Sequence, residues 1–256
     1  MTIGLLGVGH LAGSLLTGLL RAGIGPETIW LSPRGRGRSL AAEHGVELAA
    51  DNTELVERSS LVVLAVRPND AVNAVRGLPW RADHVVASAC AGVGREQLIP
   101  EVGPARVVRI MPITAAEQGA SPTLVHPLEP EVRATLQPFL DAIGTTIALD
   151  TEDQFEAATV SAAVYGWVQS LIKAGAEWGA DNGLDPATAR RLTARTFVAA
   201  GLMQADDTLP METVLAGLRT PGGITEAGLE HLDRANVPHE WVGAHDLVLR
   251  RLRGEA

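Results

Sequence analysis

One stretch near the start of the sequence, residues 3–13, constrains the fold more than any other. It reads I-G-L-L-G-V-G-H-L-A-G, a short apolar strand that runs into a glycine turn, and an apolar helix over 14–20 follows directly. In this setting Gly7 allows the sharp turn, Gly9 lets the backbone approach a pyrophosphate, and the small Ala12 lets the helix lie close to the strand. Free N–H groups at the start of that helix favour phosphate. The stretch therefore predicts a dinucleotide site, with these candidate contacts: Gly7, Gly9, His10, Leu11 and Ala12.

The composition excludes several other classes of protein. The chain of 256 residues is 46% hydrophobic and carries a net charge of −9, whereas binding to nucleic acid or to an anionic membrane needs a basic face. A single cysteine, Cys90, excludes an intrachain disulfide, and the seven histidines show no metal-ligand spacing. No apolar run approaches the ~18 residues of a membrane span. We therefore expect a globular, cytoplasmic protein without a metal site.

The residues after the second predicted strand, 28–31, indicate which dinucleotide is bound. Enzymes that use NAD place Asp or Glu at this position, about twenty residues after the glycine turn, to hold the ribose hydroxyls. This chain has S-P-R-G-R-G-R there, starting at Ser32 and including Arg34 and Arg36. Guanidinium groups suit the additional 2′-phosphate of NADP, which a carboxylate would repel. We expect NADPH, bound in part by Ser32, Arg34 and Arg36; the alternative is a solvated loop whose arginines contact nothing.

Further apolar runs rich in β-branched residues predict a doubly wound parallel sheet. They lie at 61–66, 85–89, 106–110, 123–125 and 145–149. Strand ends along one edge of such a sheet form the cofactor crevice. The candidate contacts at these ends are Ala65, Val66, Arg67, Pro68, Ala91, Met111 and Pro112. Together these elements predict an NADP-binding Rossmann domain over 1–150.

From residue 151 the alternation of strands and helices gives way to long helical stretches, which predicts a second, all-helical domain over 151–256. Its first helix is predicted over 154–182 and would be longer than ~40 Å at about 1.5 Å per residue. That helix is rich in Ala and Gly, which permits close contacts between helices. We expect this domain to form a homodimer or a larger homo-oligomer.

A second glycine-rich motif, T-P-G-G-I-T at 220–225, stands immediately before a predicted helix. Backbone N–H groups and the hydroxyls of Thr220 and Thr225 would converge on a small volume that suits a carboxylate. By itself the pattern fits an ordinary glycine-rich helix start equally well.

Together these motifs make the chain similar to the pyrroline-5-carboxylate reductase family over nearly its full length. In that family a near-identical S-P-G-G-x-T stretch, which corresponds to 220–225, binds the imino acid. The other matching pieces, spaced as in the family, are G-V-G-H-L-A at 7–12, L-A-V-R-P at 64–68, A-G-V at 91–93 and R-I-M-P at 109–112.

The resemblance implies NADPH-dependent reduction of a cyclic imine, as in the conversion of pyrroline-5-carboxylate to proline in proline biosynthesis. It also implies an N-terminal Rossmann domain and a helical C-terminal dimerisation domain. By the same resemblance Thr225 would hydrogen-bond the imine nitrogen, while Thr220, Gly222 and Gly223 would hold the carboxylate. Because the nitrogen needs at most one proton, the main task of the protein would be to position the two reactants.

Two segments depart from the family pattern. The family reads M-P-N-T-P where this chain has Ile113 after Met-Pro, and S-G-S-G-P-A-Y where this chain has S-A-A-V-Y-G-W at 161–167. Both changes fall where the substrate and the nicotinamide should meet. They leave open a different imine or a carbonyl as substrate, with Tyr165 or Lys173 as the acid, and also a non-catalytic, NADP-binding regulatory protein. Glu177, one helical turn after Lys173, predicts an ion pair between the two.

Overall fold

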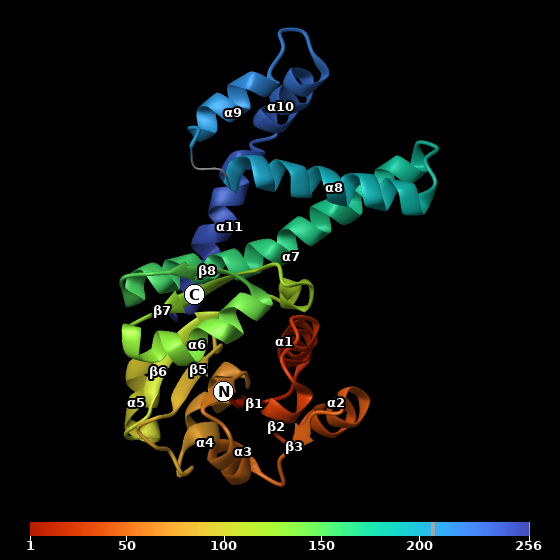
Figure 1. Cartoon of the computed structure of the whole chain (residues 1–256). Helices are drawn as coiled ribbons and strands as arrows, with labels where there is room; N and C mark the ends of the chain where they lie inside the picture. Colours follow the sequence, from red (N-terminus) through yellow and green to blue (C-terminus); the bar gives the residue numbers. More distant parts are fainter. Residues whose placement is uncertain (206–207, 256) are drawn as a thin grey trace. The chain divides into compact units, whose positions relative to one another are not determined.

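The computed structural model describes residues 1–205 and 208–255, which form two compact units, Met1–Ala162 and Ala163–Ala256. The first unit contains one eight-stranded sheet in the order β3-β2-β1-β4-β5-β6-β7-β8 (Figure 1). The strands are β1 (Ile3–Leu6), β2 (Ile29–Leu31), β3 (Glu47–Leu48), β4 (Leu61–Leu64), β5 (Val85–Ser88), β6 (Arg106–Met111), β7 (Ser121–His126) and β8 (Gly144–Ala148). The expected Rossmann-type sheet is confirmed.

Every neighbouring pair in the sheet is parallel except β6 and β7, which are antiparallel. The segment between these two strands contains only the short 3-10 turn Thr114–Gln118. A parallel crossover needs a dozen or more residues, so this connection is too short and the chain reverses direction. The sequence pattern showed seven of the eight strands, but it missed the two-residue β3 and this reversal.

Two hydrophobic clusters cover the two faces of the sheet, because successive side chains of a strand point to opposite sides. Leu5 and Val63 belong to the cluster that includes α1 and α6, whereas Leu6 and Leu64 belong to the cluster with α3, α4 and α5. The helices of this unit are α1 (His10–Arg21), α2 (Gly37–His44), α3 (Asn52–Arg58), α4 (Ala71–Val75), α5 (Arg95–Val102) and α6 (Pro130–Ile143).

The long helix α7 (Glu152–Asp181) has 30 residues, close to the predicted span. The two compact units divide inside this helix, between Ala162 and Ala163, and not before it near residue 150 as the sequence pattern suggested. The reason is the packing of the first turns of α7. Phe155 is fully buried and forms a small core with Met111 of β6 and Leu124 of β7, so these turns belong to the sheet unit.

The second unit contains the remainder of α7 and four further helices, as predicted. They are α8 (Pro186–Ala205), α9 (Met211–Leu218), α10 (Ile224–Arg234) and α11 (Val237–Leu252). In a single chain several large apolar side chains of this unit are exposed, among them Trp178 at 69%, Leu202 at 68% and Ile224 at 94%. Among the residues that the structure describes, no helix is long and apolar enough to cross a membrane.

His84, which immediately precedes β5, is a buried titratable residue of the sheet unit. The backbone N–H of Arg81 donates a hydrogen bond to its Nδ1 over 3.2 Å, and the ring lies edge-on to Trp80 with centroids 6.0 Å apart. Its Nε2 has no hydrogen-bond partner within residues 1–205 and 208–255. Burial, with a smaller contribution from Arg81, lowers the pKa of His84 below its ordinary value.

Acidification should therefore destabilise the fold through His84. The unfolded chain binds the proton more readily than the folded one, so the contribution of the neutral ring is fully present above about pH 6.5 and is lost as the pH falls below it. We expect the free energy of unfolding, from urea denaturation, to fall between about pH 7 and about pH 5, and to fall less steeply in His84→Gln. The exposed residue His231 provides the control: His231→Gln should keep the wild-type slope. An unchanged slope in His84→Gln would contradict this assignment.

Candidate functional site

The glycine turn between β1 and α1 has the geometry that phosphate binding requires. Gly7 has a φ of +94°, and a Cβ at this residue would lie 2.5 Å from Val66 Cγ1 and 2.8 Å from the Val66 backbone nitrogen, so only glycine fits. Gly9 is the N-cap of α1 and has no side-chain cap. A Cβ on Gly9 would meet nothing within 4 Å, so space is open in front of the free N–H groups of the helix start.

Residues 32–36 are hydrogen-bonded to this turn. The Ser32 hydroxyl accepts a hydrogen bond from the backbone N–H of Gly7 over 3.0 Å, and the N–H of Arg36 donates to the Val8 carbonyl over 2.9 Å. Arg36 Nη1 lies 3.4 Å from the position that a Cβ on Gly13 would take, so its guanidinium lies beside the first turns of α1. The arginine-rich loop therefore lies beside the phosphate turn, as the sequence analysis requires.

Arg34 and Arg36 are exposed, and neither forms an ion pair within the described part of the chain. The position at the end of β2 is held by the neutral Ser32 and not by a carboxylate. Two guanidinium groups without an intramolecular acid are available for an anion outside the chain. This arrangement favours a phosphate over two ribose hydroxyls at this end of the site.

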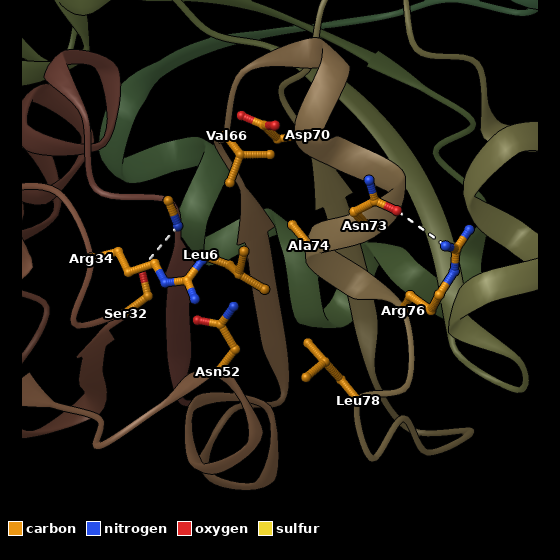
Figure 2. A pocket seen from close by; sticks show the side chains of 11 residues that line it. Leu6, Ser32, Arg34, Asn52, Val66, Asp70, Asn73, Ala74, Arg76 and Leu78 are labelled. Atoms are coloured by element: carbon orange, nitrogen blue, oxygen red, sulfur yellow. Dashed lines mark hydrogen bonds between the residues drawn. The ribbon is translucent and has the colours of Figure 1, made fainter.

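A cleft of about 460 Å³ opens beside the turn (Figure 2). Four of the predicted contacts, Gly7, Ser32, Arg34 and Val66, line it. The other lining residues are Leu6, Asn52, Asp70, Asn73, Ala74, Arg76 and Leu78. The sequence did not indicate these residues, because most of them lie on or beside α3 and α4, and these two short helices show no apolar periodicity. The only available signal for Asn52 was Asp51 directly before it, whose side chain caps α3 through the N–H of Glu54.

The other predicted contacts of this unit lie in two places. Those between Ala65 and Pro112 lie at or just after the ends of β4, β5 and β6, at the same edge of the sheet, and those from His10 to Ala12 lie at the start of α1. The registers pair Leu6 of β1 with Leu64 of β4, and the N–H of Ala65 donates to the Leu6 carbonyl over 2.8 Å, so the two strand ends are level. Arg67 and Pro68 are exposed, Ala91 is half-buried, and Met111 and Pro112 are buried. His10 is exposed and Leu11 half-buried at the start of α1, where Ala12 is buried.

Cys90 packs as a small apolar residue of the sheet core. Its thiol donates toward the Val66 carbonyl over 3.4 Å. Burial raises the pKa of the Cys90 thiol, and the residue is almost completely shielded from solvent, so neither its environment nor its access favours a nucleophilic role. Among the described residues no group of three or more His, Cys, Asp or Glu side chains is placed to hold a metal ion.

The motif at 220–225 forms the turn between α9 and α10. Gly222 has a φ of +71°, and Gly223 is the N-cap of α10 and has no side-chain cap. The N–H of Gly222 donates to a carboxylate oxygen of Glu226 over 2.8 Å, and the N–H of Gly223 donates to the Thr220 carbonyl over 2.8 Å. Thr225 is exposed. The turn thus presents a backbone N–H that already binds a carboxylate of its own helix.

The two candidate acids of α7 lie in different environments. Lys173 Nζ lies 2.5 Å from Glu177 Oε1, which confirms the predicted ion pair, and both side chains are exposed. Tyr165 is half-buried. Trp167, two residues later, packs edge-on against Trp241 and His245 of α11, with ring centroids 5.5 Å and 5.2 Å away.

The parallel sheet, the uncapped glycine turn and the cleft at the carboxyl ends of the strands define a dinucleotide-binding protein of the Rossmann class. Residues 2–92 match the family described as NADP oxidoreductase, coenzyme F420-dependent, and residues 152–253 match the family described as pyrroline-5-carboxylate reductase dimerisation. A pyrroline-5-carboxylate reductase of Pseudomonas aeruginosa is 30% identical over 237 residues, which cover 89% of this chain and 87% of that protein. The chain belongs to the pyrroline-5-carboxylate reductase family, whose members are NAD(P)H oxidoreductases that act on a C=N bond.

Other relatives and solved structures agree with this assignment. Pyrroline-5-carboxylate reductase 2 of Bacillus subtilis is 28% identical and covers 90% of this chain and 86% of its own. The structure of the reductase from Streptococcus pyogenes has a TM-score of 0.86 with 24% identity and covers 99% of this chain and 98% of that one. A Plasmodium falciparum pyrroline carboxylate reductase with NADP bound has a TM-score of 0.87 at 19% identity, covering 100% and 98%. These two structures show the same fold, and the resemblance drawn from the motifs is confirmed.

The two glycines of the phosphate turn should respond differently to a methyl group. Gly9→Ala should change the free energy of unfolding by less than about 1 kcal/mol, because its Cβ meets open space, but should weaken dinucleotide binding at least about tenfold by blocking the pyrophosphate. Gly7→Ala should instead destabilise the fold by about 1–3 kcal/mol, because of its positive φ and the contact with Val66. Urea denaturation and fluorescence titration measure the two effects. Equal effects of both variants on stability would contradict this division of roles.

Proposed function

We propose that this protein reduces pyrroline-5-carboxylate to proline with NADPH. The observation that carries the proposal is the match to relatives named pyrroline-5-carboxylate reductase over about nine tenths of the chain, in a protein that retains the turn at 220–225. The test is NADPH consumption with pyrroline-5-carboxylate, run beside pyrroline without the carboxylate and beside a larger cyclic imine. Turnover mainly of the carboxylate substrate is the expected result.

The residues around the cleft fit NADPH. Gly9 and the uncapped start of α1 would hold the pyrophosphate, while Ser32, Arg34 and Arg36 would hold the 2′-phosphate. The open space in front of Gly9 and the unpaired state of both arginines support this assignment. When bound, NADPH supplies the hydride for the imine carbon.

The turn between α9 and α10 would bind the substrate. Thr220 and the N–H groups of Gly222 and Gly223 would hold its carboxylate, and the existing hydrogen bond from Gly222 to the Glu226 carboxylate supports this chemistry. An incoming carboxylate would take the place of Glu226 at Gly222, and the N–H of Gly223 would exchange its bond to the Thr220 carbonyl for one to the substrate. The Thr225 hydroxyl would hydrogen-bond the imine nitrogen, which orients the reacting bond and can relay one proton.

The second unit would form the homodimer. Its matched family is described as a dimerisation domain, and large apolar side chains of the unit, including Trp178, Leu202 and Ile224, are exposed in the single chain. We place the dimer contact within residues 151–256. Burial of these side chains against a second copy would remove them from water.

Ile113 and the segment 161–167 favour a second candidate function, the reduction of a different imine. The first replaces a polar residue of the family pattern, and the second places Val164, Tyr165 and Trp167 where the family has small residues and a terminal tyrosine. An imine that is bulkier or lacks the carboxylate would then be the substrate, with Tyr165 as the proton donor. Turnover only of the imines without carboxylate would favour this function. NADPH binding without any turnover would favour a regulatory protein.

The preference for NADPH over NADH should depend on Arg34 and Arg36. A hydrogen bond to a charged group contributes about 1.5–3 kcal/mol, so Arg34→Ala and Arg36→Ala should each weaken NADPH binding at least about tenfold and NADH binding much less. Dissociation constants from fluorescence titration measure both. Arg133→Ala on α6 is the control for loss of an exposed arginine, and equal losses for both cofactors would contradict the 2′-phosphate contact.

Removal of the Thr225 hydroxyl should slow turnover. Thr225→Val keeps the shape of the side chain, and loss of one hydrogen bond to the reacting nitrogen should lower kcat about ten- to a hundredfold. Thr225→Ser should retain most of the activity. Thr213→Val on α9 makes the same chemical change at another exposed threonine and should leave kcat unchanged. Wild-type kcat in Thr225→Val would exclude the assigned role.

A further inference from the structure

Arg109 of β6 is a charged residue in the interior of the sheet unit, with 2% of its side chain exposed. Its Nη1 lies 2.7 Å from Glu152 Oε1, and its Nη2 lies 3.1 Å from Glu156 Oε2. The two glutamates are one turn apart at the start of α7, and the guanidinium lies over the ring of Phe155 between them, 4.4 Å from its centroid. One arginine therefore contacts three side chains in the first turns of α7, those of Glu152, Phe155 and Glu156.

A fourth titratable side chain completes this cluster. His126 of β7 is paired in register with Arg109, and its Nε2 lies 3.6 Å from Glu152 Oε2. Its Nδ1 lies 2.9 Å from the Leu149 carbonyl oxygen, which can only accept, so Nδ1 is the donor. Glu152 thus lies beside side chains from two strands of the sheet, Arg109 of β6 and His126 of β7.

A cluster of buried charges contributes little net stability to a fold. Desolvation of buried charges offsets much of their attraction, and apolar residues of similar size would often serve as well. Directional contacts from a planar guanidinium instead fix the position and the rotation of the helix start relative to β6. The question is what this fixed geometry serves.

Phe155 connects the cluster to the candidate cofactor site. Its ring packs on one side against the Arg109 guanidinium and shares a small core with Met111 and Leu124, against which Ala91 is packed. Met111, the last residue of β6, and Ala91, which follows β5, are predicted cofactor contacts at this edge of the sheet.

We propose that Arg109 is a positioning residue for the reaction. Through Glu152, Glu156 and Phe155 it fixes the wall formed by Met111 and Ala91, against which the nicotinamide ring would lie. This inference rests on the proposed function for its kinetic consequences. Its binding consequences depend only on a nicotinamide dinucleotide entering the cleft.

The test uses the full-length protein with Arg109→Lys, which loses the two-pronged contact, and Glu156→Gln, which keeps the size of the side chain. Binding is compared for NADPH and for adenosine 2′,5′-bisphosphate, which lacks the nicotinamide. We expect NADPH affinity to fall about three- to tenfold and the affinity for the bisphosphate to stay within about twofold. With a reducible imine, kcat should fall about ten- to a hundredfold and the primary isotope effect from deuterated NADPH should rise.

Asp83→Asn makes the same carboxylate-to-amide change at an exposed arginine pair, Arg81–Asp83, and should alter none of these quantities. Glu156→Asp, which keeps the charge, should recover part of kcat. If Arg109→Lys does not fold, the NADPH affinity and the kcat of Glu156→Gln test the proposal. Lowered thermal stability with unchanged NADPH affinity and kcat would overturn the proposal, as would equal losses for NADPH and the bisphosphate. If wild type turns over no imine, the proposed function fails, while the binding comparison still decides on Arg109.

Discussion

The candidate cofactor site depends on the close approach of two backbone segments, at Gly7 and at Val66. The carboxyl ends of β1 and β4 are level in the sheet, and the chain must leave β1 through a turn with positive φ beside the next strand end. A side chain at Gly7 would push these ends apart. With them in contact, α1 begins at the sheet edge, and its uncapped start follows Gly7, which lines the cleft. The arginine loop follows from the same arrangement, since Arg36 is hydrogen-bonded to Val8 inside the turn.

The charge at the candidate cofactor site is opposite in sign to the net charge of the chain. The protein carries a net charge of −9, yet Arg34 and Arg36 form no ion pair with the described residues and lie beside the glycine turn, where they can meet an anion. Arg109 shows the opposite use of the same side chain, because its charge is buried and neutralised by Glu152 and Glu156. Exposed guanidinium groups suit recognition, whereas a buried and fully paired one suits the fixing of geometry.

The turn between α9 and α10, the proposed substrate site, binds a carboxylate of its own helix. Gly222 binds the Glu226 carboxylate, so the free turn already satisfies a donor that a substrate carboxylate could later use. Exchange of one carboxylate for another changes little in the number of hydrogen bonds. In the proposed complex the gain in binding would come from additional contacts of the substrate, such as the one proposed for Thr225.

The sequence by itself determined the Rossmann sheet, the helical second unit, the phosphate turn and the Lys173–Glu177 pair, because each depends on local pattern: apolar period, glycine position and spacing along a helix. Tertiary structure decided what depends on residues far apart in the chain. The antiparallel β7, the inclusion of the start of α7 in the sheet unit, the place of Asn52 in the cleft and the burial of Arg109 all arise from packing between distant segments. A charged residue inside a strand looks exposed in a one-dimensional pattern, and only its partners 43 and 47 positions later show why it can be buried.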